Sequence, residues 1–174
     1  MIEILEAKPQ DARAIDDLLK KTWLDTYPNE EAGITKEDIE KFIKERFTED
    51  SIKARAEALQ NHGENKKFLV AKDGDALVGN CLFLNNEKNY QLKGVYVLPE
   101  YQRKGIGQMF WKQAQEFLVD KKDIIVWVAS YNIKAISFYE KLGFLKTDKD
   151  LSGQYYEIAP GKYIPEIEMI LRRS

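Results

Sequence analysis

The spacing of apolar residues in the N-terminal third of the chain predicts one strand followed by helices. Residues 2–7 alternate between apolar and polar side chains, a period typical of a strand. From Gln10 the apolar residues recur at helical intervals until Pro28, which disfavours a longer helix. Residues 35–47 repeat that spacing and open on a threonine and an aspartate that form a near capping box. Residues 51–59 add a further helical turn or two.

The rest of the chain alternates between β-rich and helical segments. Residues 67–98 contain three β-rich runs separated by polar turns, which predicts an antiparallel meander. A helix follows from Ile106, then a strand at 124–129, a helix over 132–142 that stops at a glycine, and two or three final strands. This order predicts a single mixed α/β sheet covered by helices, with residues 1–174 forming one domain.

Composition and charge narrow the class of protein. The 174 residues are 44% hydrophobic and 32% charged, which is ordinary for a globular protein. Because 27 basic residues balance 29 acidic ones, no net charge draws the chain to nucleic acid or to an anionic membrane. The sequence shows no secretory leader and no apolar run long enough to span a bilayer, so we expect a cytoplasmic protein. One cysteine, Cys81, and one histidine are too few for a disulfide or a zinc cluster, so we expect no metal site.

A glycine-containing turn stands where the meander gives way to a helix. A basic pair precedes two glycines, and the four residues are Arg103, Lys104, Gly105 and Gly107. Such a turn exposes main-chain N–H groups at a helix start, where they attract anions. A dinucleotide fingerprint needs a third glycine where Phe110 stands, and the chain has no P-loop Gly-Lys-Ser/Thr. A turn with two positions lacking Cβ and two cations beside it suits a diphosphate, although the glycines could also simply make a tight turn.

Two motifs in this region resemble those of a known family. Residues 102–107 resemble the Q/R-x-x-G-x-G/A signature of the GCN5-related N-acetyltransferases, the GNAT superfamily, and residues 93–102 resemble the family's fourth strand. Residues 129–144 resemble its second motif, N-x-x-A-x-x-F-Y-x-x-x-G-F. Both motifs stand at the family's separation, and the order of elements fits the family along the chain.

The resemblance implies a GNAT fold, in which the fourth and fifth strands splay apart, and acetyl-CoA as the cosubstrate. The coenzyme A diphosphate would lie on the N–H groups of residues 103–107, and the pantetheine arm would pair with Val95 and Val97. The Val97 N–H would polarise the thioester carbonyl, and Tyr139 would be the catalytic residue that gives its proton to the departing sulfur. The implied cofactor-binding residues are Val95, Val97, Gln102, Arg103, Lys104, Gly105, Ile106, Gly107, Gln108 and Asn132. From the residues alone, Tyr139 would belong to the core and Asn132 would be a helix N-cap.

The sequence leaves the general base open. Some members of the family carry a glutamate on the fourth strand, but residues 90–95 contain no carboxylate. A water relay could end on Asp25, Glu87 or Glu157, or the amine could arrive deprotonated. His62 has a suitable pKa range, but it lies in a polar stretch that predicts an exposed loop.

In the family the first two helices and their connection build most of the acceptor wall. Residues 25–40 of this chain carry six acids and one base, a net charge of −5, next to aromatic residues. An acidic, aromatic rim suits a cationic amine, but the same acids could form only a solvated face. On the interpretation as an acidic, aromatic rim, we expect Trp23, Asp25 and Tyr27 to bind the acceptor. The run T-W-x-D-T-Y resembles the matching segment of bacterial relatives that acetylate polyamines.

The expected function is transfer of an acetyl group from acetyl-CoA to a primary amine of a small cationic acceptor, with polyamines among the candidates. Two alternatives stay open: an acetyltransferase for protein N-termini or lysine side chains, and a sensor domain that binds acyl-CoA without chemistry. Exposed edge strands could pair across a dimer axis, so a homodimer also stays open.

Overall fold

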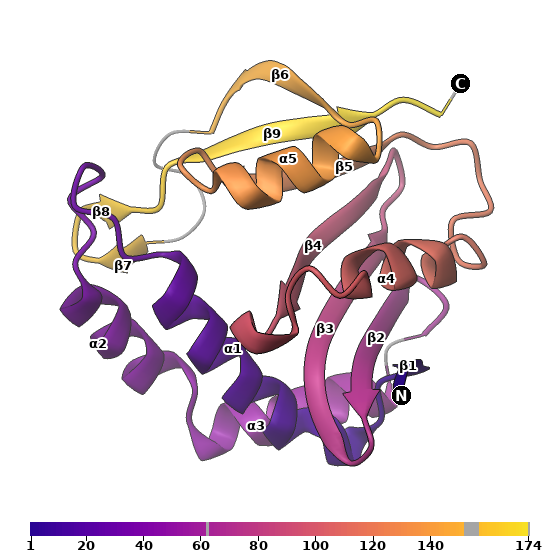
Figure 1. Ribbon diagram of the computed structural model, residues 1–174, viewed down its shortest axis with the longest axis horizontal. Coiled ribbons are helices and arrows are strands. Elements are labelled where there is room, and N and C mark those ends of the chain that lie inside the picture. The colour runs from indigo at the N-terminus through magenta and orange to yellow at the C-terminus, as the bar shows by residue number, and fades with distance from the viewer. Residues whose placement is uncertain (62, 152–156, 174) are drawn as a thin grey trace.

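A computed structural model describes residues 1–61, 63–151 and 157–173, so His62 lies outside the described residues. Its main feature is a seven-stranded sheet with the order β1-β2-β3-β4-β5-β9-β6 (Figure 1). The strands of this sheet are β1 (Ile2–Glu6), β2 (Lys66–Asp73), β3 (Ala76–Asn85), β4 (Tyr90–Val97), β5 (Ile124–Ala129), β6 (Leu145–Asp150) and β9 (Glu166–Leu171). A separate hairpin joins β7 (Glu157–Ala159) to β8 (Lys162–Tyr163). The mixed α/β sheet predicted from the sequence is confirmed.

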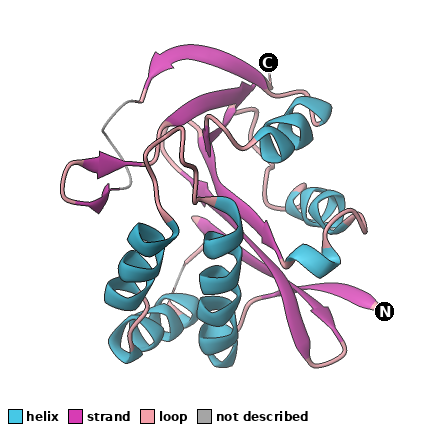
Figure 2. Cartoon of the chain, turned by 60° about the vertical axis from the view of Figure 1, so that its left-hand side comes forward, coloured by secondary structure: helices cyan, strands magenta, loops and turns pink. Residues whose placement is uncertain are grey.

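Helices cover both faces of the sheet, as Figure 2 shows. One layer holds α1 (Ala12–Thr26), α2 (Lys36–Arg46) and α3 (Glu49–Gln60), and the other holds α4 (Ile106–Ala114) and α5 (Ile133–Lys141). Short 3-10 turns, η1 (Pro9–Asp11) and η2 (Pro99–Tyr101), precede α1 and α4. In the part of the chain that the structure describes, none of the helices combines the length and the apolar character needed to cross a membrane.

Local side-chain chemistry sets the helix ends. Thr35 caps α2 by accepting a hydrogen bond from the Asp38 N–H at 3.1 Å, while the Asp38 carboxylate accepts from the Thr35 N–H at 2.9 Å. The capping box expected at this threonine is therefore confirmed. A second pair, Thr48 and Ser51, caps α3 in the same way. Because this cap lies before Glu49, α3 is longer than the turn or two expected from residue 51 onward.

Strands β4 and β5 separate partway along their length. They pair in parallel only from Tyr90 to Leu92, opposite Ile124 to Val126. Just past this point Lys93 interrupts the register between β3 and β4, which produces a bulge. Residues 93–97 then continue beside β3 alone, and the two strands diverge (Figure 1). The splayed fourth and fifth strands expected from the resemblance are confirmed.

The core occupies both faces of the sheet. On the α1–α3 side Trp23 stacks on Phe42, with 5.1 Å between ring centroids. On the α4–α5 side Trp111 contacts Phe83 and Phe144 at centroid distances of 6.3 and 5.8 Å. These two apolar layers hold α1 and α5 against opposite faces of the diverging strands, so a site at the gap is bounded by helices from both layers.

Candidate active site

The unpaired edge of β4 presents main-chain groups toward β5. The Leu98 N–H donates to the Val78 carbonyl at 3.0 Å, so this residue faces β3. Main-chain groups of successive residues in a strand point to opposite sides, so those of Val95 and Val97 face away from β3 and into the gap. The Gln102 side chain donates to the Val97 carbonyl at 3.2 Å and ties the end of β4 to the following turn.

Tyr139 lies on the α5 side of this gap and is buried. Burial is the main cause that raises the pKa of Tyr139 far above its usual value, and nearby Cys81 and Tyr96 add to it. A main-chain hydrogen bond at Val95 opposes the increase and places the phenol against the unpaired part of β4. The phenol is therefore neutral at physiological pH and can act as a proton donor.

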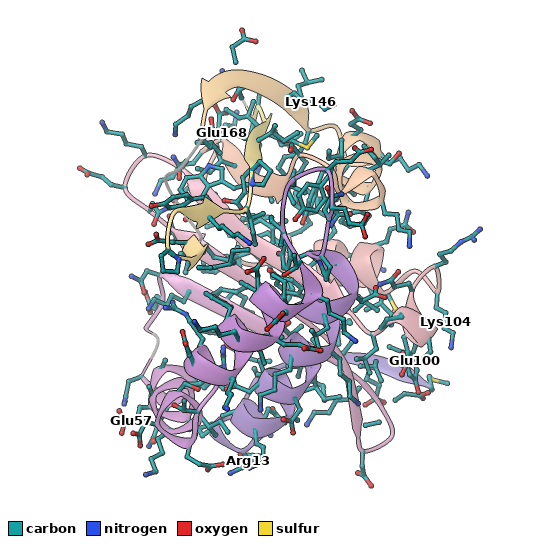
Figure 3. All side chains as sticks on the ribbon, turned by 90° about the vertical axis from the view of Figure 1, so that its left-hand side faces the viewer. Arg13, Glu57, Glu100, Lys104, Lys146 and Glu168 are labelled. Atoms are coloured by element: carbon teal, nitrogen blue, oxygen red, sulfur yellow. The ribbon has the colours of Figure 1, made fainter. Side chains whose placement is uncertain are left out.

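The turn after β4 has the geometry of an anion site. Arg103 and Gly105 both have left-handed backbones, with φ of 63° and 80°, and α4 begins at the next residue. The first N–H groups of a helix have no partner inside it, so those at the start of α4 point out of the turn. Arg103 and Lys104 are exposed, and the Lys104 ammonium lies 4.4 Å from the Tyr101 ring centroid. Figure 3 shows Lys104 extending outward from the turn.

Glycine suits the two positions of the turn for different structural reasons. A Cβ on Gly105 would meet nothing within 4 Å, so this position is sterically open, and its left-handed backbone is what favours glycine. A Cβ on Gly107 would lie 2.9 Å from two ring carbons of Phe138 in α5. The sequence interpretation that both glycines serve ligand approach is therefore incomplete, because Gly107 also leaves room for the Phe138 ring where α4 packs on α5.

Asn132 forms the N-cap of α5. Its side-chain oxygen accepts a hydrogen bond from the Ala135 N–H at 3.1 Å. The capping role expected from the sequence is confirmed. Ile106 is buried under the turn and Gln108 is exposed on the first turn of α4.

A cavity of about 560 Å³ lies on the opposite face of the sheet, toward α1, α2 and α3. Its lining residues are Leu19, Trp23, Phe42, Glu45, Arg46, Phe47, Ser51, Ala54, Arg55, Asn80, Leu82, Lys93, Gly94 and Tyr96. Side chains alternate along a strand, so Tyr96 faces this cavity while Val95 faces the α4–α5 layer. The two faces of one short stretch of β4 thus meet the cavity and Tyr139.

The expected acceptor residues lie at different places relative to this cavity. Trp23 lines it, and Tyr27 reaches it through a 3.0 Å hydrogen bond between its hydroxyl and that of Tyr96. Asp25 is exposed on α1 and is not part of the lining. Asp38, another acid of the predicted rim, pairs with Lys162 at 2.7 Å.

The lining of this cavity contains none of the six acids counted in residues 25–40. Glu45 is its one acidic side chain, beside the bases Arg46, Arg55 and Lys93. The Arg55 guanidinium is paired with the buried Asp16. Counting residues 25–40 could not reveal this. One of the six acids is exposed on α1, two are exposed in the connection to α2, and three belong to α2.

One carboxylate near the gap was missed by sequence reasoning. Asp25, Glu87 and Glu157, the three relay candidates, are all exposed, and Glu157 accepts a hydrogen bond from the Gly161 N–H at 2.9 Å. Glu166 of β9 instead borders a cavity of about 10 Å³ together with Gln91, Leu92, Lys93 and Trp127. The available signal was an acid in a strand of alternating pattern that would pair inside a helix-covered sheet, where charged side chains are rare.

Comparison with known proteins identifies the family of the chain. A model of the acetyltransferase (GNAT) family matches residues 15–144. The chain belongs to the GNAT acetyltransferase family. The enzyme class expected from the sequence, an N-acetyltransferase, is confirmed.

Two curated relatives and one solved structure illustrate the similarity. The acetyltransferase is 28% identical over 153 residues to a spermidine N(1)-acetyltransferase of Thermoplasma acidophilum, covering 86% of this chain and 91% of that one. It is 33% identical over 113 residues to the thialysine N-epsilon-acetyltransferase of Sus scrofa, covering 54% of this chain and 66% of the relative. The crystal structure of the PaiA N-acetyltransferase of Thermoplasma acidophilum in complex with coenzyme A has the same fold, with a TM-score of 0.78, 24% identity and 99% coverage of both chains.

The family match covers only part of the candidate site of the acetyltransferase. Val95, Tyr139 and the turn at residues 102–108 lie inside the matched segment. Glu166 lies beyond its end, so the match itself carries no information about this carboxylate.

Proposed function

We propose that this acetyltransferase moves the acetyl group of acetyl-CoA directly to a primary amine of a small acceptor. The observation that carries the proposal is the gap beside Val95, with a buried phenol on one face of the sheet and the 560 Å³ cavity on the other. A thioester entering the gap would be reached by an amine from one side and by a proton donor from the other.

The residues present fit a coenzyme A thioester. In the described chain, β4 pairs with β3 alone from residue 93 onward. The Val95 carbonyl and the Val97 N–H face the gap and can bind an extended amide-containing arm, whereas the Val97 carbonyl accepts from Gln102 and the Val95 N–H contacts Tyr139. The N–H groups at the start of α4, with Arg103 and Lys104 beside them, suit a diphosphate. Gly105 leaves open space next to this turn. These groups would hold the cosubstrate.

Within this proposal two groups of the chain assist the chemistry. When bound, acetyl-CoA supplies an acyl carbon activated by its thiol leaving group. The Val97 N–H, which faces the gap, would donate to the carbonyl oxygen and stabilise the negative charge that develops there. Tyr139, held neutral by burial, would donate its proton to the departing sulfur. Loss of either group should slow acetyl transfer more than it weakens binding.

The acceptor class has two candidates. The aromatic side chains of the cavity, among them Trp23, Phe42 and Tyr96, can contact an alkyl ammonium chain, which supports a polyamine, the acceptor named for one relative. The cations Arg46 and Lys93 in the same lining favour an acceptor that also carries an anionic group, such as an amino acid with a side-chain amine. The name of the second relative, a thialysine acetyltransferase, supports this second candidate.

The test is release of free coenzyme A from acetyl-CoA with a panel of amines. The panel contains spermidine, spermine, lysine, other amino acids, aminoglycosides and short peptides with free N-termini or lysines. Turnover on polyamines or on lysine-like amino acids would support the proposal and choose between the two classes. Turnover on peptides alone would replace it with a protein acetyltransferase, and acetyl-CoA binding without turnover on any amine would replace it with a sensor.

A further inference from the structure

Glu166 stands at the open end of the splayed strands. In the register of β9 on β5 it lies opposite Ala129, the last residue of β5, whereas the paired part of β4 ends at Leu92. Its side chain nevertheless borders a cavity with Lys93 of β4, so it reaches the region where β4 and β5 have separated.

One oxygen of this carboxylate has no protein partner. Glu166 Oε2 is buried, and no hydrogen-bonding group within the described residues contacts it. A buried carboxylate oxygen without a hydrogen bond destabilises the folded protein, and such atoms in native proteins normally have a partner. Glu168, two residues along the same strand, shows the ordinary arrangement: its oxygens accept from Trp127 Nε1 at 3.0 Å, Lys149 Nζ at 3.0 Å and Thr147 Oγ1 at 3.3 Å.

The cavity beside Glu166 has the size of one water molecule and shares the lining residue Lys93 with the larger cavity. Its volume is about 10 Å³, enough for a single water, and its walls include the polar side chains of Gln91 and Lys93. Lys93 also lines the 560 Å³ cavity on the α1–α3 face. A water held here would lie between the Glu166 carboxylate and Lys93, the residue that borders both cavities.

The groups that face Glu166 decide its charge. Burial raises the pKa of Glu166 to about 7, and the positive charge of Lys93 opposes the increase. The phenol of Tyr131, whose pKa burial and the nearby Glu166 raise to about 12, stays neutral. Glu168 is neutralised by Lys149 of β6. Glu166 can thus take up and release a proton near neutral pH, which is the range a general base needs.

We propose that Glu166 is the general base of the reaction and receives the proton of the acceptor ammonium through one water molecule in the small cavity. The inference rests on the proposed function. A primary amine is mostly protonated near pH 7 and cannot attack in that form. Its nitrogen loses two protons in all as the C–N bond forms and the C–S bond breaks. The first goes through the water to Glu166 and then to solvent, and the second replaces the proton that Tyr139 gives to sulfur, so one proton is released per turnover.

The test compares Glu166→Gln with Glu168→Gln, which removes a carboxylate of the same strand that already has its partners. We expect kcat/KM for the amine to rise with pH through an inflection near 7 in the wild type and in Glu168→Gln. Glu166→Gln should lose the inflection and about tenfold or more of the rate at neutral pH.

A second readout uses the protein without acetyl-CoA. Carbon NMR of glutamate-labelled protein should show one carboxyl group titrating near pH 7 in the wild type and in Glu168→Gln, and none in Glu166→Gln. Unchanged rate and inflection in Glu166→Gln, with the wild type active, would overturn the base and leave the acetyltransferase proposal standing. A wild type that turns over no amine would overturn the proposed function and this role with it, whatever the NMR titration shows.

Discussion

The hydroxyl oxygens of Tyr27 and Tyr96 lie 3.0 Å apart, which fastens the end of α1 to the unpaired half of β4. Tyr131 donates its hydroxyl to the Tyr27 carbonyl at 2.8 Å and adds the segment after β5 to the same contact. Both diverging strands are therefore connected to α1, the helix that carries Trp23 into the larger cavity.

Because of this connection, we expect a change at Tyr27 to alter KM for the amine and not KM for acetyl-CoA. Tyr27→Phe removes the hydrogen bond to Tyr96 and should raise KM for the amine about fivefold, the equivalent of about 1 kcal/mol, with KM for acetyl-CoA unchanged. Steady-state kinetics with each substrate varied in turn measures this. Tyr163→Phe, on the exposed β8, is the matched control and should leave both KM values unchanged. Equal changes in the two KM values for Tyr27→Phe would contradict a role on the amine side.

The contact of Gly107 with Phe138 predicts a packing defect. Gly107→Ala places a methyl group 2.9 Å from the Phe138 ring and should lower the free energy of unfolding by about 1 to 3 kcal/mol. Because the clash is with the ring, the same change in a Phe138→Leu background should cost less. A double-mutant cycle by urea unfolding measures the coupling. Additive losses would mean that Gly107 is not required by Phe138.

Burial of Glu166 predicts a pH-dependent gain in stability on its removal. Its folded-state pKa, about 7, lies above the ordinary value, so the stability it contributes is present at low pH and is lost as the pH rises through 7. Glu166→Gln should leave unfolding unchanged at about pH 4 and stabilise the protein by about 2 kcal/mol at about pH 8, after allowance for its partial exposure.

Removal of the Glu168 carboxylate is expected to change stability in the opposite direction. Burial raises its pKa, but hydrogen bonds from Trp127 and Lys149, the Lys149 charge and a hydrogen bond from Thr147 together lower it below the ordinary value. Its stability contribution is present above the unfolded-state pKa and lost in acid, so Glu168→Gln should destabilise the protein at about pH 8. Urea unfolding at both pH values distinguishes the two variants, and the same sign for both would contradict these environments.

Breaking the buried ion pair of Asp16 and Arg55 is expected to lower the free energy of unfolding strongly. Breaking an exposed pair is the matched control and should have a small effect. Asp16 is fully buried in α1 and accepts from Arg55 and, at 3.2 Å, from Ser51, and both of these residues line the larger cavity. Asp16→Asn should cost about 2 to 4 kcal/mol because it leaves the guanidinium without its counter-charge. Glu49→Gln breaks an exposed pair with Arg13 and should leave the free energy of unfolding nearly unchanged, because water screens both charges. Equal effects in urea unfolding would show that burial does not distinguish the pairs.

The sequence predicted the parts of the site that depend on local patterns. The strand, turn and helix at residues 90–114 and the N-cap at Asn132 follow from spacing and capping chemistry, and the resemblance supplied the divergence of β4 from β5. Long-range packing could not be predicted in the same way. The position of β9 between β5 and β6 brings Glu166 toward Lys93, and the packing of α4 on α5 places Phe138 against Gly107. Neither contact can be predicted from the neighbouring residues in the sequence.

The charges that line the larger cavity could not be predicted from the sequence either. A net charge of −5 over residues 25–40 left open both an acidic, aromatic rim and a solvated acidic face, because a count along the chain does not say which side chains turn inward. Asp25 is exposed, and the cavity takes its charges from Glu45, Arg46, Arg55 and Lys93. Helix periodicity identifies the buried face of α1 but not the far walls that α2, α3 and β4 contribute.

The most direct test of the central claim is the rate of coenzyme A release by Tyr139→Phe at saturating acetyl-CoA and amine, measured beside the wild type and Tyr90→Phe. Tyr90 is another buried phenol, with its hydroxyl accepting from the Asp120 N–H at 3.2 Å at the paired end of β4, so the control makes the same change away from the gap. If Tyr139 protonates the leaving sulfur, Tyr139→Phe should lower kcat about 10- to 100-fold, with acetyl-CoA binding retained and Tyr90→Phe close to the wild type. A Tyr139→Phe enzyme with the wild-type kcat would contradict the account.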